Sequence, residues 1–388
     1  EHRVANRSDF KKIEVGALIA GGGIAGSALF RYMADSGLNP VLVNADRGSS
    51  WRNIGGGRTA FSLPELAEIA EHNHAIFKEL QKMSNIDYKT TRYINLAHDE
   101  ATFNALDASR AWSDAYMVDP KNFQKEISPY FSTKSKRYLG ALITNDCWQA
   151  TPGKVVDLIR NMGVSAGGRI VEDCKVLEVM KEGSTYSILV LTHDKKYVEF
   201  RTEIFVNALG AGAGKICEGL GIHAGLYPVR HQAFITRRLP MLGKNGDSLD
   251  MLIDRQEYKG FSAVYGQQLL HTGQIIGCAS PRVDALRTDK NLILNTKEFM
   301  EIVSEFFVDW VPELAGVSIQ ATWSGYYTEP RYIVDPELGL FVGMRGHGFM
   351  LSQYLAKIYV DKLMGRPVPE YFDQLKLNGP GLSEKAFK

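Results

Sequence analysis

A glycine-rich turn between two apolar runs constrains the fold of this chain more than any other feature of its sequence. The first apolar run ends at the segment GGGIAG, in which Gly21, Gly23 and Gly26 have the spacing G-x-G-x-x-G. A helical pattern follows up to Gly37, and a second apolar run leads to Asp46, twenty residues after Gly26. In a dinucleotide-binding βαβ unit the glycines make the tight turn, admit the pyrophosphate and allow close packing. The sequence therefore predicts such a unit near the start of the chain.

The pattern leaves two questions about the nucleotide open. An acid near the end of the second strand binds the ribose in such units. Asp46 has the expected offset, and Asn44 competes with it if the register of the strand shifts by two residues. The N-terminus of the helix would face the phosphates. NAD and FAD both fit this arrangement.

The composition of the chain argues against several classes of protein. The 388 residues are enough for two domains, and the net charge of +1 gives no reason to expect nucleic acid or an anionic membrane as partner. The apolar runs are shorter than the roughly 20 residues of a membrane-spanning helix. The four cysteines form no CxxC pair, which argues against a zinc site and favours a reducing compartment. We therefore expect a cytoplasmic protein without a metal site or a membrane span.

The rest of the chain predicts further helices without an obvious linker between them. A capping box of Ser62 and Glu65 predicts the start of a helix that continues to Leu80. Three more helices are expected over 153–163, 296–312 and 348–367, with ends at Gly163, Pro312 and Gly365. The aromatic residues within 299–310 have helical spacing and are expected in a core. Strand-like runs lie between the helices, so we expect domains woven from discontinuous segments.

Four further motifs follow one another along the chain. They are WRNIGGGRTAF (51–61), EIFVNALGAGAGKI (203–216), YPVRHQAF (227–234) and WSGYYTEPRYIVDPELGLFVGMRGHGFMLS (323–352). Together with the glycine turn they resemble the D-amino-acid oxidase, glycine oxidase and sarcosine oxidase family of FAD-dependent oxidoreductases. The resemblance covers about residues 13–365 and implies that the nucleotide is FAD.

The resemblance implies an α/β fold in which a Rossmann-like FAD-binding domain of the GR2 type is interleaved with an α+β substrate domain on a large mixed sheet. The predicted FAD-binding domain comprises 13–62, 145–220 and 320–366, the substrate domain 63–144 and 221–319, and the tails 1–12 and 367–388. Gly325 stands where the sarcosine oxidases of the family carry the cysteine that bonds to the flavin. We therefore expect FAD to bind noncovalently.

Several segments contribute candidate FAD-binding residues. They are Gly21, Gly23, Ile24, Ala25, Asp46, Arg47, Arg52, Asn53, Gly56, Gly57, Arg58, Val176, Ala208, Gly210, Gly346, His347, Gly348, Phe349 and Met350. The last five begin a helix after the turn RGHG. Its N-terminal amides and dipole would stabilise the negative charge of a reduced flavin.

The chain departs from the family at the positions that hold substrate. Met350 stands where sarcosine-type enzymes carry a lysine for the substrate carboxylate, and Phe61 stands where they carry an arginine. Arg345 is the first replacement that we expect, because a guanidinium binds a carboxylate in a bidentate manner, and Arg331 is the second. The candidate catalytic residues are Arg345, His347 and Tyr327, and the candidate substrate-binding residues are Arg345, Arg331, Tyr326, Tyr327 and Met350.

The sequence predicts oxidation of the C–N bond of a small amine or amino acid, with hydride transfer to flavin N5, hydrolysis of the imine and reoxidation by O2 or another acceptor. Such chemistry depends on positioning and desolvation more than on a dedicated base. Two alternatives remain. One is a 2-hydroxy-acid or glycerol-phosphate dehydrogenase, in which His347 or His271 would act as the base. The other is a flavoprotein subunit that works with a partner in a larger amino-acid dehydrogenase.

Overall fold

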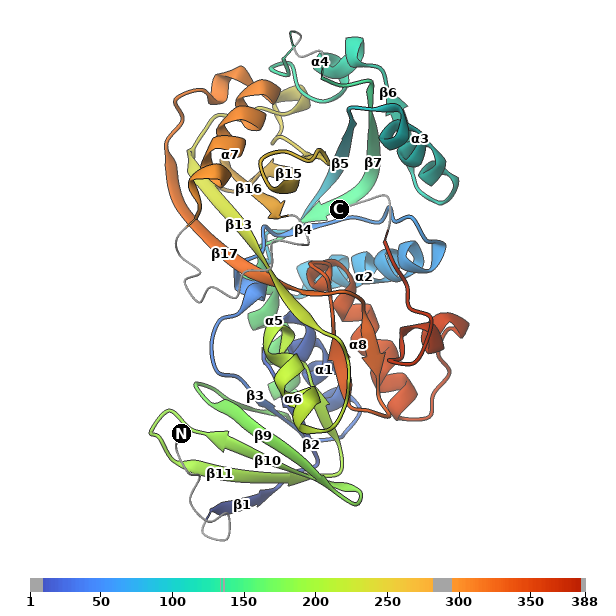
Figure 1. Cartoon of the computed structure of the whole chain (residues 1–388), viewed down its shortest axis with the longest axis vertical. Coiled ribbons are helices and arrows are strands. Elements are labelled where there is room, and N and C mark those ends of the chain that lie inside the picture. Colours follow the sequence, from blue (N-terminus) through green and yellow to red (C-terminus); the bar gives the residue numbers. More distant parts are fainter. Residues whose placement is uncertain (1–9, 133, 135–136, 282–294, 385–388) are drawn as a thin grey trace. The chain divides into compact units, whose positions relative to one another are not determined.

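The computed structural model describes residues 10–132, 134, 137–281 and 295–384, and the chain divides into two compact units (Figure 1). Unit 1 comprises Glu1–Trp51, Gly153–Tyr227 and Thr328–Gly381. Unit 2 comprises Arg52–Pro152, Pro228–Tyr327 and Leu382–Lys388. Each unit is assembled from separate segments of the chain. The predicted fold, an α/β domain interleaved with a domain on a large mixed sheet, is confirmed.

A six-stranded sheet forms the centre of unit 1. Its order is β18-β19-β12-β2-β3-β8. The strands are β2 (Ala17–Ala20), β3 (Pro40–Val43), β8 (Arg169–Val171), β12 (Phe205–Asn207), β18 (Ile333–Asp335) and β19 (Leu340–Val342). The four strands β12, β2, β3 and β8 run parallel, and every residue of β2 and β3 is buried. This explains why both strands have continuous apolar sequences, since a parallel strand is covered on both faces.

A second sheet of four strands completes the β-structure described in unit 1, in the order β1-β11-β10-β9. Its strands are β1 (Lys11–Glu14), β9 (Lys175–Glu182), β10 (Thr185–Leu191) and β11 (Tyr197–Thr202). An apolar layer joins the two sheets, with Leu18 and Val41 from one and Ile188 and Val190 from the other. The helices of this unit are α1 (Ile24–Asp35), α5 (Pro152–Ser165), α6 (Ala213–Gly219) and α8 (Gly348–Leu363), and α1 packs against α8.

Unit 2 is built on a mixed sheet in the order β17-β13-β16-β15-β14-β5-β7-β4, with β6 also paired to β7. The strands are β4 (Gly56–Gly57), β5 (Lys89–Ala97), β6 (Ala115–Val118), β7 (Gly140–Gln149), β13 (Tyr227–Arg238), β14 (Met251–Asp254), β15 (Phe261–Gln268), β16 (Gln274–Pro281) and β17 (Ile319–Glu329). The helices are α2 (Pro64–Met83), α3 (Glu100–Ala108), α4 (Phe123–Glu126) and α7 (Lys297–Trp310).

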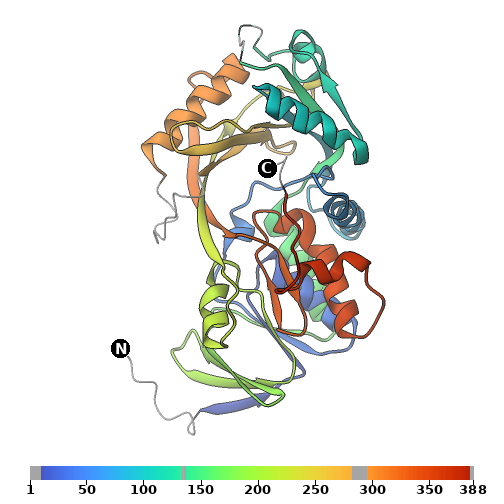
Figure 2. The same ribbon diagram turned by 45° about the vertical axis from the view of Figure 1, so that its right-hand side comes forward.

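Helix α7 covers one face of the sheet in unit 2, next to β15 and β16 (orange in Figure 2). Its aromatic residues Phe299, Phe306, Phe307 and Trp310 are buried in the core of this face, as their spacing predicted. The helix begins after Thr296, whose hydroxyl accepts a hydrogen bond from the Phe299 N–H at 3.2 Å. The opposite face of the sheet carries a separate cluster, in which Tyr265 and Trp323 pack against Tyr93, Ile253 and Cys278.

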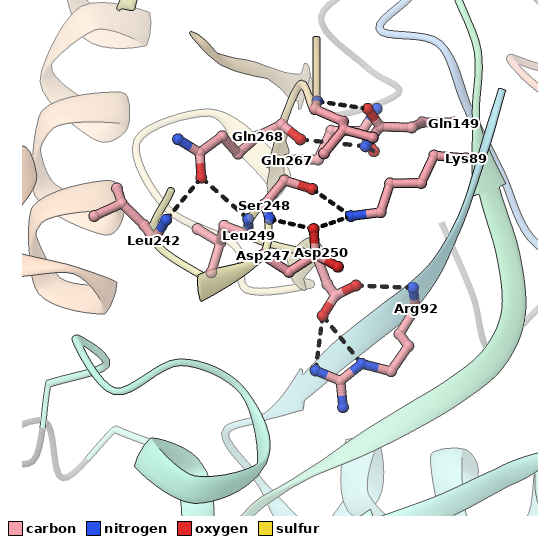
Figure 3. A network of polar contacts seen from close by, with 11 residues as sticks. Lys89, Arg92, Gln149, Leu242, Asp247, Ser248, Leu249, Asp250, Gln267 and Gln268 are labelled. Carbon is pink, nitrogen blue, oxygen red and sulfur yellow. Dashed lines mark hydrogen bonds and ion pairs between the residues drawn. The ribbon is translucent and has the colours of Figure 1, made fainter. Parts of the chain in front are cut away.

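Polar side chains hold the segment before β14 against β5 and β15 (Figure 3). Arg92 of β5 forms an ion pair with Asp250, in which Nη2 and Nε both donate to Oδ2, at 2.7 and 3.0 Å. The Nζ of Lys89 contacts the Asp247 carboxylate and donates to the Ser248 hydroxyl at 2.9 Å. Buried Gln268 accepts the N–H groups of residues 242 and 249 at 2.9 and 3.1 Å. These contacts satisfy the polar groups at this sheet end, where an unpaired group would be costly.

Two local predictions are wrong. Helix α5 continues past Gly163 to Ser165, because Gly163 serves helix packing: a Cβ at this position would lie 2.5 Å from the Phe30 ring. Helix α2 has Leu63 as its N-cap, without a side-chain cap, and the Ser62 N–H donates to the Glu384 carboxylate at 2.9 Å. In both places a residue type typical of a helix end serves a tertiary contact.

The boundaries of the compact units also differ from the predicted domains. Residues 52–62, 145–152 and 320–327 belong to unit 2, and 221–227 and 367–381 belong to unit 1. Pairing within the large sheet explains the first group, because β4 pairs with the end of β7 at Gly56↔Gln149 and β17 lies beside β13.

Among the residues that the structure describes, none of the helices has the length and apolar character of a membrane span. The four cysteines are buried free thiols. Within the same residues no group of three His, Cys, Asp or Glu side chains could hold a metal ion.

Candidate functional site

The three glycines of the turn between β2 and α1 differ in backbone conformation and in the space around them. Gly21 has a φ of +103°, which favours glycine. A Cβ on Gly26 would lie 1.8 Å from the Gly21 carbonyl oxygen, so only glycine lets the helix approach the turn this closely. A Cβ on Gly23 would meet only the Ser50 side chain within 4 Å. The turn therefore has a tight bend, a close helix contact and an open side, which fits the roles that the motif predicts for a pyrophosphate site.

The end of β12 and the start of α1 complete this turn. A Cβ on Gly21 would lie 2.4 Å from the Ala208 carbonyl oxygen, and the Ala208 N–H donates to the Ala20 carbonyl at 2.8 Å. Gly23 is the N-cap of α1, and the Ile24 N–H donates to the Ser50 hydroxyl at 2.7 Å. The positive end of the helix dipole is therefore at the open side of the turn, where it would stabilise phosphate.

A cluster of three side chains holds the turn from its other side, and two of them, Arg160 and Glu172, were not predicted from the sequence. Arg160 of α5 is buried, and its Nη2 donates to the Gly22 carbonyl oxygen. Its Nη1 pairs with Glu172 Oε1 at 2.6 Å. The amide of Asn44 accepts from the Gly22 N–H at 3.2 Å and donates to Glu172 Oε2 at 2.8 Å. Burial lowers the pKa of Arg160, and the Glu172 carboxylate opposes that effect.

The turn before α8 is held by hydrogen bonds within unit 1. Arg345 has a left-handed φ of +48°, and its Nε lies 2.7 Å from a Glu329 carboxylate oxygen. His347 is the N-cap of α8, is buried, and pairs through Nδ1 with the Tyr332 hydroxyl. His347 therefore shapes the turn, and Arg345 has a carboxylate partner in the chain itself. A substrate contact of Arg345 stays a prediction.

Arg331 holds the segment that follows α8. Its Nη2 donates to the carbonyl oxygens of Lys376 and Gly379, both at 2.8 Å. A Cβ on Gly381 would lie 3.3 Å from the Arg331 guanidinium carbon. These contacts give Arg331 a structural role, and its predicted role in substrate binding stays a prediction.

In unit 2, the segment from Arg52 to Arg58 lies against the sheet. Trp323 Nε1 donates to the Arg52 carbonyl and Gln267 Nε2 to the Ile54 carbonyl, each at 2.8 Å. A Cβ on Gly56 would lie 2.2 Å from the Tyr93 hydroxyl. A Cβ on Gly57 would lie 2.0 Å from the Trp148 ring. Close packing on the sheet therefore explains these two glycines.

An aromatic group occupies the face of this sheet opposite α7. The rings of His231 on β13 and Tyr327 on β17 stack with centroids 3.5 Å apart. The hydroxyls of Tyr327 and Tyr265, which lies on β15, are 2.8 Å apart. Burial raises the pKa of Tyr265 well above its usual value, and burial likewise raises the pKa of Tyr93 on β5. These phenols therefore stay protonated and serve as hydrogen-bonding groups and ring walls rather than as bases.

Charged residues lie near the same sheet. Arg58 is buried, and its guanidinium carbon lies 4.1 Å from the centroid of the Phe61 ring. Glu384 is buried as well, and it accepts the Ser62 N–H. Burial lowers the pKa of Arg255, and the charge of Glu384 partly offsets this, whereas that of Arg58 adds to it. Two guanidinium groups and one carboxylate thus interact here, and the carboxylate comes from the segment that follows Gly381.

The predicted site residues are divided between the two units. Unit 1 holds Gly21, Gly23, Ile24, Ala25, Asp46, Arg47, Val176, Ala208, Gly210, Arg331, Arg345, Gly346, His347, Gly348, Phe349 and Met350. Unit 2 holds Arg52, Asn53, Gly56, Gly57, Arg58, Tyr326 and Tyr327. The residues that sequence reasoning missed are Ser50, Arg160 and Glu172 in unit 1 and His231, Arg255, Tyr265 and Glu384 in unit 2. Only the alternating pattern of β13 and β15 signals any of them.

Comparison with known proteins gives one family and a set of similar folds. Residues 17–362 match the family model DAO, described as FAD dependent oxidoreductase. The structure is similar to L-proline dehydrogenase from P. horikoshii, with a TM-score of 0.79 and 21% identity over 95% of this chain and 97% of that one. Glycine oxidase from Geobacillus kaustophilus gives 0.78 and 18%, with 94% and 98% covered.

Two further similar proteins act on a different type of compound. L-α-glycerophosphate oxidase from Mycoplasma pneumoniae, solved with FAD bound, has a TM-score of 0.71 and 15% identity over 91% of this chain and 95% of that one. Subunit A1 of the anaerobic glycerol-3-phosphate dehydrogenase of Haloferax volcanii is 27% identical over 240 residues, which are 54% of this chain. The matched part spans 39% of that subunit.

The glycine turn fits the cofactor that the family model names. The open side at Gly23 and the N-terminus of α1 suit a pyrophosphate. Val176, another predicted FAD-binding residue, lies in the apolar layer between the two sheets of unit 1. The cofactor is FAD. The predicted noncovalent attachment stays a prediction.

Proposed function

The chain belongs to the DAO family of FAD-dependent oxidoreductases, and from this premise we propose that it oxidises the C–N bond of a small amine or amino acid. Bound FAD supplies the two-electron acceptor for this reaction. The C–H bond next to nitrogen breaks, and the hydrogen leaves with both electrons as a hydride. The nitrogen lone pair forms the C=N bond, and water hydrolyses the resulting imine to a carbonyl compound and an amine or ammonia.

The observation that carries this proposal is the aromatic face of unit 2. Tyr265 and Tyr327 form a hydroxyl pair, and His231 stacks on Tyr327. Burial raises the pKa of Tyr265 well above its usual value, so this phenol stays protonated and can take part in hydrogen bonds but does not act as a base at neutral pH. A neutral amine needs no base for hydride loss, because its own lone pair assists the departure.

The proposed reaction has two possible forms, which differ in the compound that takes the electrons from the reduced flavin. An oxidase passes the electrons to O2, whereas a dehydrogenase passes them to another acceptor or to a partner subunit. The relative from Haloferax volcanii is named as one subunit of a dehydrogenase, which supports keeping the second form.

One observation favours a second function, the oxidation of a C–O bond in a 2-hydroxy acid or a glycerol phosphate. That reaction needs a base for the hydroxyl proton. Sequence reasoning named His347 and His271 for this role, but His347 is bonded to the Tyr332 hydroxyl, and the His271 side chain is 48% exposed beyond the end of β15. His231 is the better candidate, because it lies on the aromatic face beside Tyr327. The names of two relatives agree with this alternative.

The test is anaerobic mixing of the flavoprotein with amines, D- and L-amino acids, 2-hydroxy acids and glycerol 3-phosphate, followed through the visible flavin absorbance. Bleaching by an amine or amino acid supports the proposal, and recovery of the colour in air then identifies an oxidase. Bleaching without recovery identifies a dehydrogenase. Bleaching only by hydroxy compounds overturns the C–N assignment, and the variant His231→Ala should then lose the reaction.

A further inference from the structure

The residue that directly follows β3 is an amide where a dinucleotide-binding unit has its ribose carboxylate. Such a unit places an Asp or Glu at the end of the second strand. Here β3 ends at Val43, and Asn44 follows it. The Asn44 N–H donates to the Val171 carbonyl at 3.0 Å, which fixes it beside the end of β8. The Asn44 side chain also accepts a hydrogen bond from the Gly22 N–H, so it lies next to the glycine turn.

A carboxylate from the neighbouring strand lies one hydrogen bond away from this position. β8 runs parallel to β3 with Val43 opposite Val171, so Glu172 follows β8 at the same edge of the sheet. Ligands of such sheets bind at the carboxyl ends of the strands. The Oε2 of Glu172 accepts from Asn44 Nδ2 at 2.8 Å, and its Oε1 pairs with Arg160 at 2.6 Å.

The environment of Glu172 differs from that of Asp46, the acid that the sequence predicted for the ribose. Two donors on fixed elements hold its carboxylate, yet 48% of the side chain is exposed, so a further donor can reach the oxygens. Each carboxylate oxygen accepts more than one hydrogen bond. Asp46 lies two residues farther from the strand and is exposed. A carboxylate held in place loses less conformational entropy on binding than one on an exposed loop.

We propose that Glu172, held by Asn44 and Arg160, is the acceptor for the hydroxyl of the adenosine ribose of FAD, in place of Asp46 and of an acid at position 44. Arg160 contacts both this carboxylate and the Gly22 carbonyl. One side chain therefore holds both Glu172, which would bind the ribose, and the glycine turn, which would bind the phosphates. This inference concerns cofactor binding alone and does not depend on the substrate of the enzyme.

The experiment compares FAD with an FAD analogue that carries 2′-deoxyadenosine. The bound cofactor of the full-length flavoprotein is exchanged, and the dissociation constant follows from the flavin fluorescence released on dilution. We expect the unchanged protein to bind FAD about tenfold more tightly than the analogue, because a hydrogen bond to a charged group is lost. In Glu172→Gln this ratio should fall to near one, and in Asp46→Asn it should stay near tenfold.

The ratio separates recognition from a merely structural role. If Glu172 only supports Arg160 and the turn, Glu172→Gln weakens both ligands by the same factor and leaves the ratio unchanged, which overturns the proposal. A ratio that collapses in Asp46→Asn also overturns it, as does a ratio near one in the unchanged protein. Thermal melting of each variant shows whether the fold is kept. A failure of the substrate assay leaves all of these readings intact.

Discussion

The glycine turn between β2 and α1 in unit 1 and the aromatic face of unit 2 are built in different ways. The turn uses mainly backbone from one short segment, and its key residues have no side chain at all. The aromatic face uses side chains from separate strands, with His231 on β13, Tyr265 on β15 and Tyr327 on β17. A cofactor common to a family needs a fixed backbone, whereas substrate specificity changes through single side chains. We therefore expect the two regions to respond differently to substitution.

The largest effect should come from Gly26→Ala in the turn. The added Cβ would lie 1.8 Å from a backbone oxygen, and neither the turn nor the start of α1 can yield without losing the phosphate site. The expected cost is at least about 3 kcal/mol, seen as a large rise in the FAD dissociation constant or as loss of folded protein. Gly48→Ala is the matched control, because a Cβ there meets nothing within 4 Å. Equal behaviour of the two variants would contradict the backbone account of the turn.

The next effect concerns a buried carboxyl in unit 2. Asp254 lies on the α7 side of β14, is fully buried, and accepts from the Tyr138 hydroxyl at 2.8 Å. Burial raises its pKa to about 6. The folded state therefore favours the protonated carboxyl, and this contribution is complete below the unfolded pKa of 3.8 and is lost as the pH rises through about 6.

Asp254→Asn stays neutral at every pH and should remove this dependence. Between pH 4 and pH 7, the free energy of unfolding of the unchanged protein should fall by about 2 kcal/mol relative to the variant. Urea unfolding followed by tryptophan fluorescence at several pH values measures this difference. A constant difference across the range would show that Asp254 ionises in the folded protein as it does in the unfolded chain.

A smaller loss of stability is expected for Glu384→Ala. This change removes the acceptor of the Ser62 N–H and the carboxylate near Arg255. Because a hydrogen bond to a charged group contributes about 2 kcal/mol, the melting temperature should fall. Glu370→Ala, at an exposed carboxylate of the C-terminal region, is the control. If both variants melt alike, the Glu384 contact contributes nothing to unit 2.

The comparison also explains how far the sequence could predict this protein. The glycines of the turn, its helix and its two flanking strands all lie within residues 13–46, so local patterns were enough to find them. Arg160 and Glu172 reach the turn only when α5 and β8 pack beside it, and no local pattern encodes that contact. Tyr327 was a candidate because of a family motif, and its role stays a prediction, but its partner Tyr265 was not named because alternation along β15 does not reveal which side chains it contacts. Gly163 misled the prediction of a helix end, because glycine serves helix ends and close packing equally well.

The smallest effect should come from Tyr327→Phe on the aromatic face. The variant keeps the ring that stacks on His231 and loses only the hydroxyl that bonds to Tyr265. One neutral hydrogen bond is worth about 1 kcal/mol, so we expect a roughly fivefold change in kcat/KM with the substrate that bleaches the flavin. The FAD dissociation constant should not change, in contrast to Gly26→Ala.

Tyr130→Phe, at a phenol that is 41% exposed, controls for loss of a tyrosine hydroxyl as such. A Tyr327→Phe variant that weakens FAD binding and leaves kcat/KM intact would reverse the assignment of the two regions. The hydroxyl pair would then serve the cofactor, and the search for the substrate contacts would move to Arg345 and its ion pair with Glu329 in unit 1. The expected result instead separates the two tasks, with backbone geometry holding the cofactor and side-chain hydroxyls tuning the reaction.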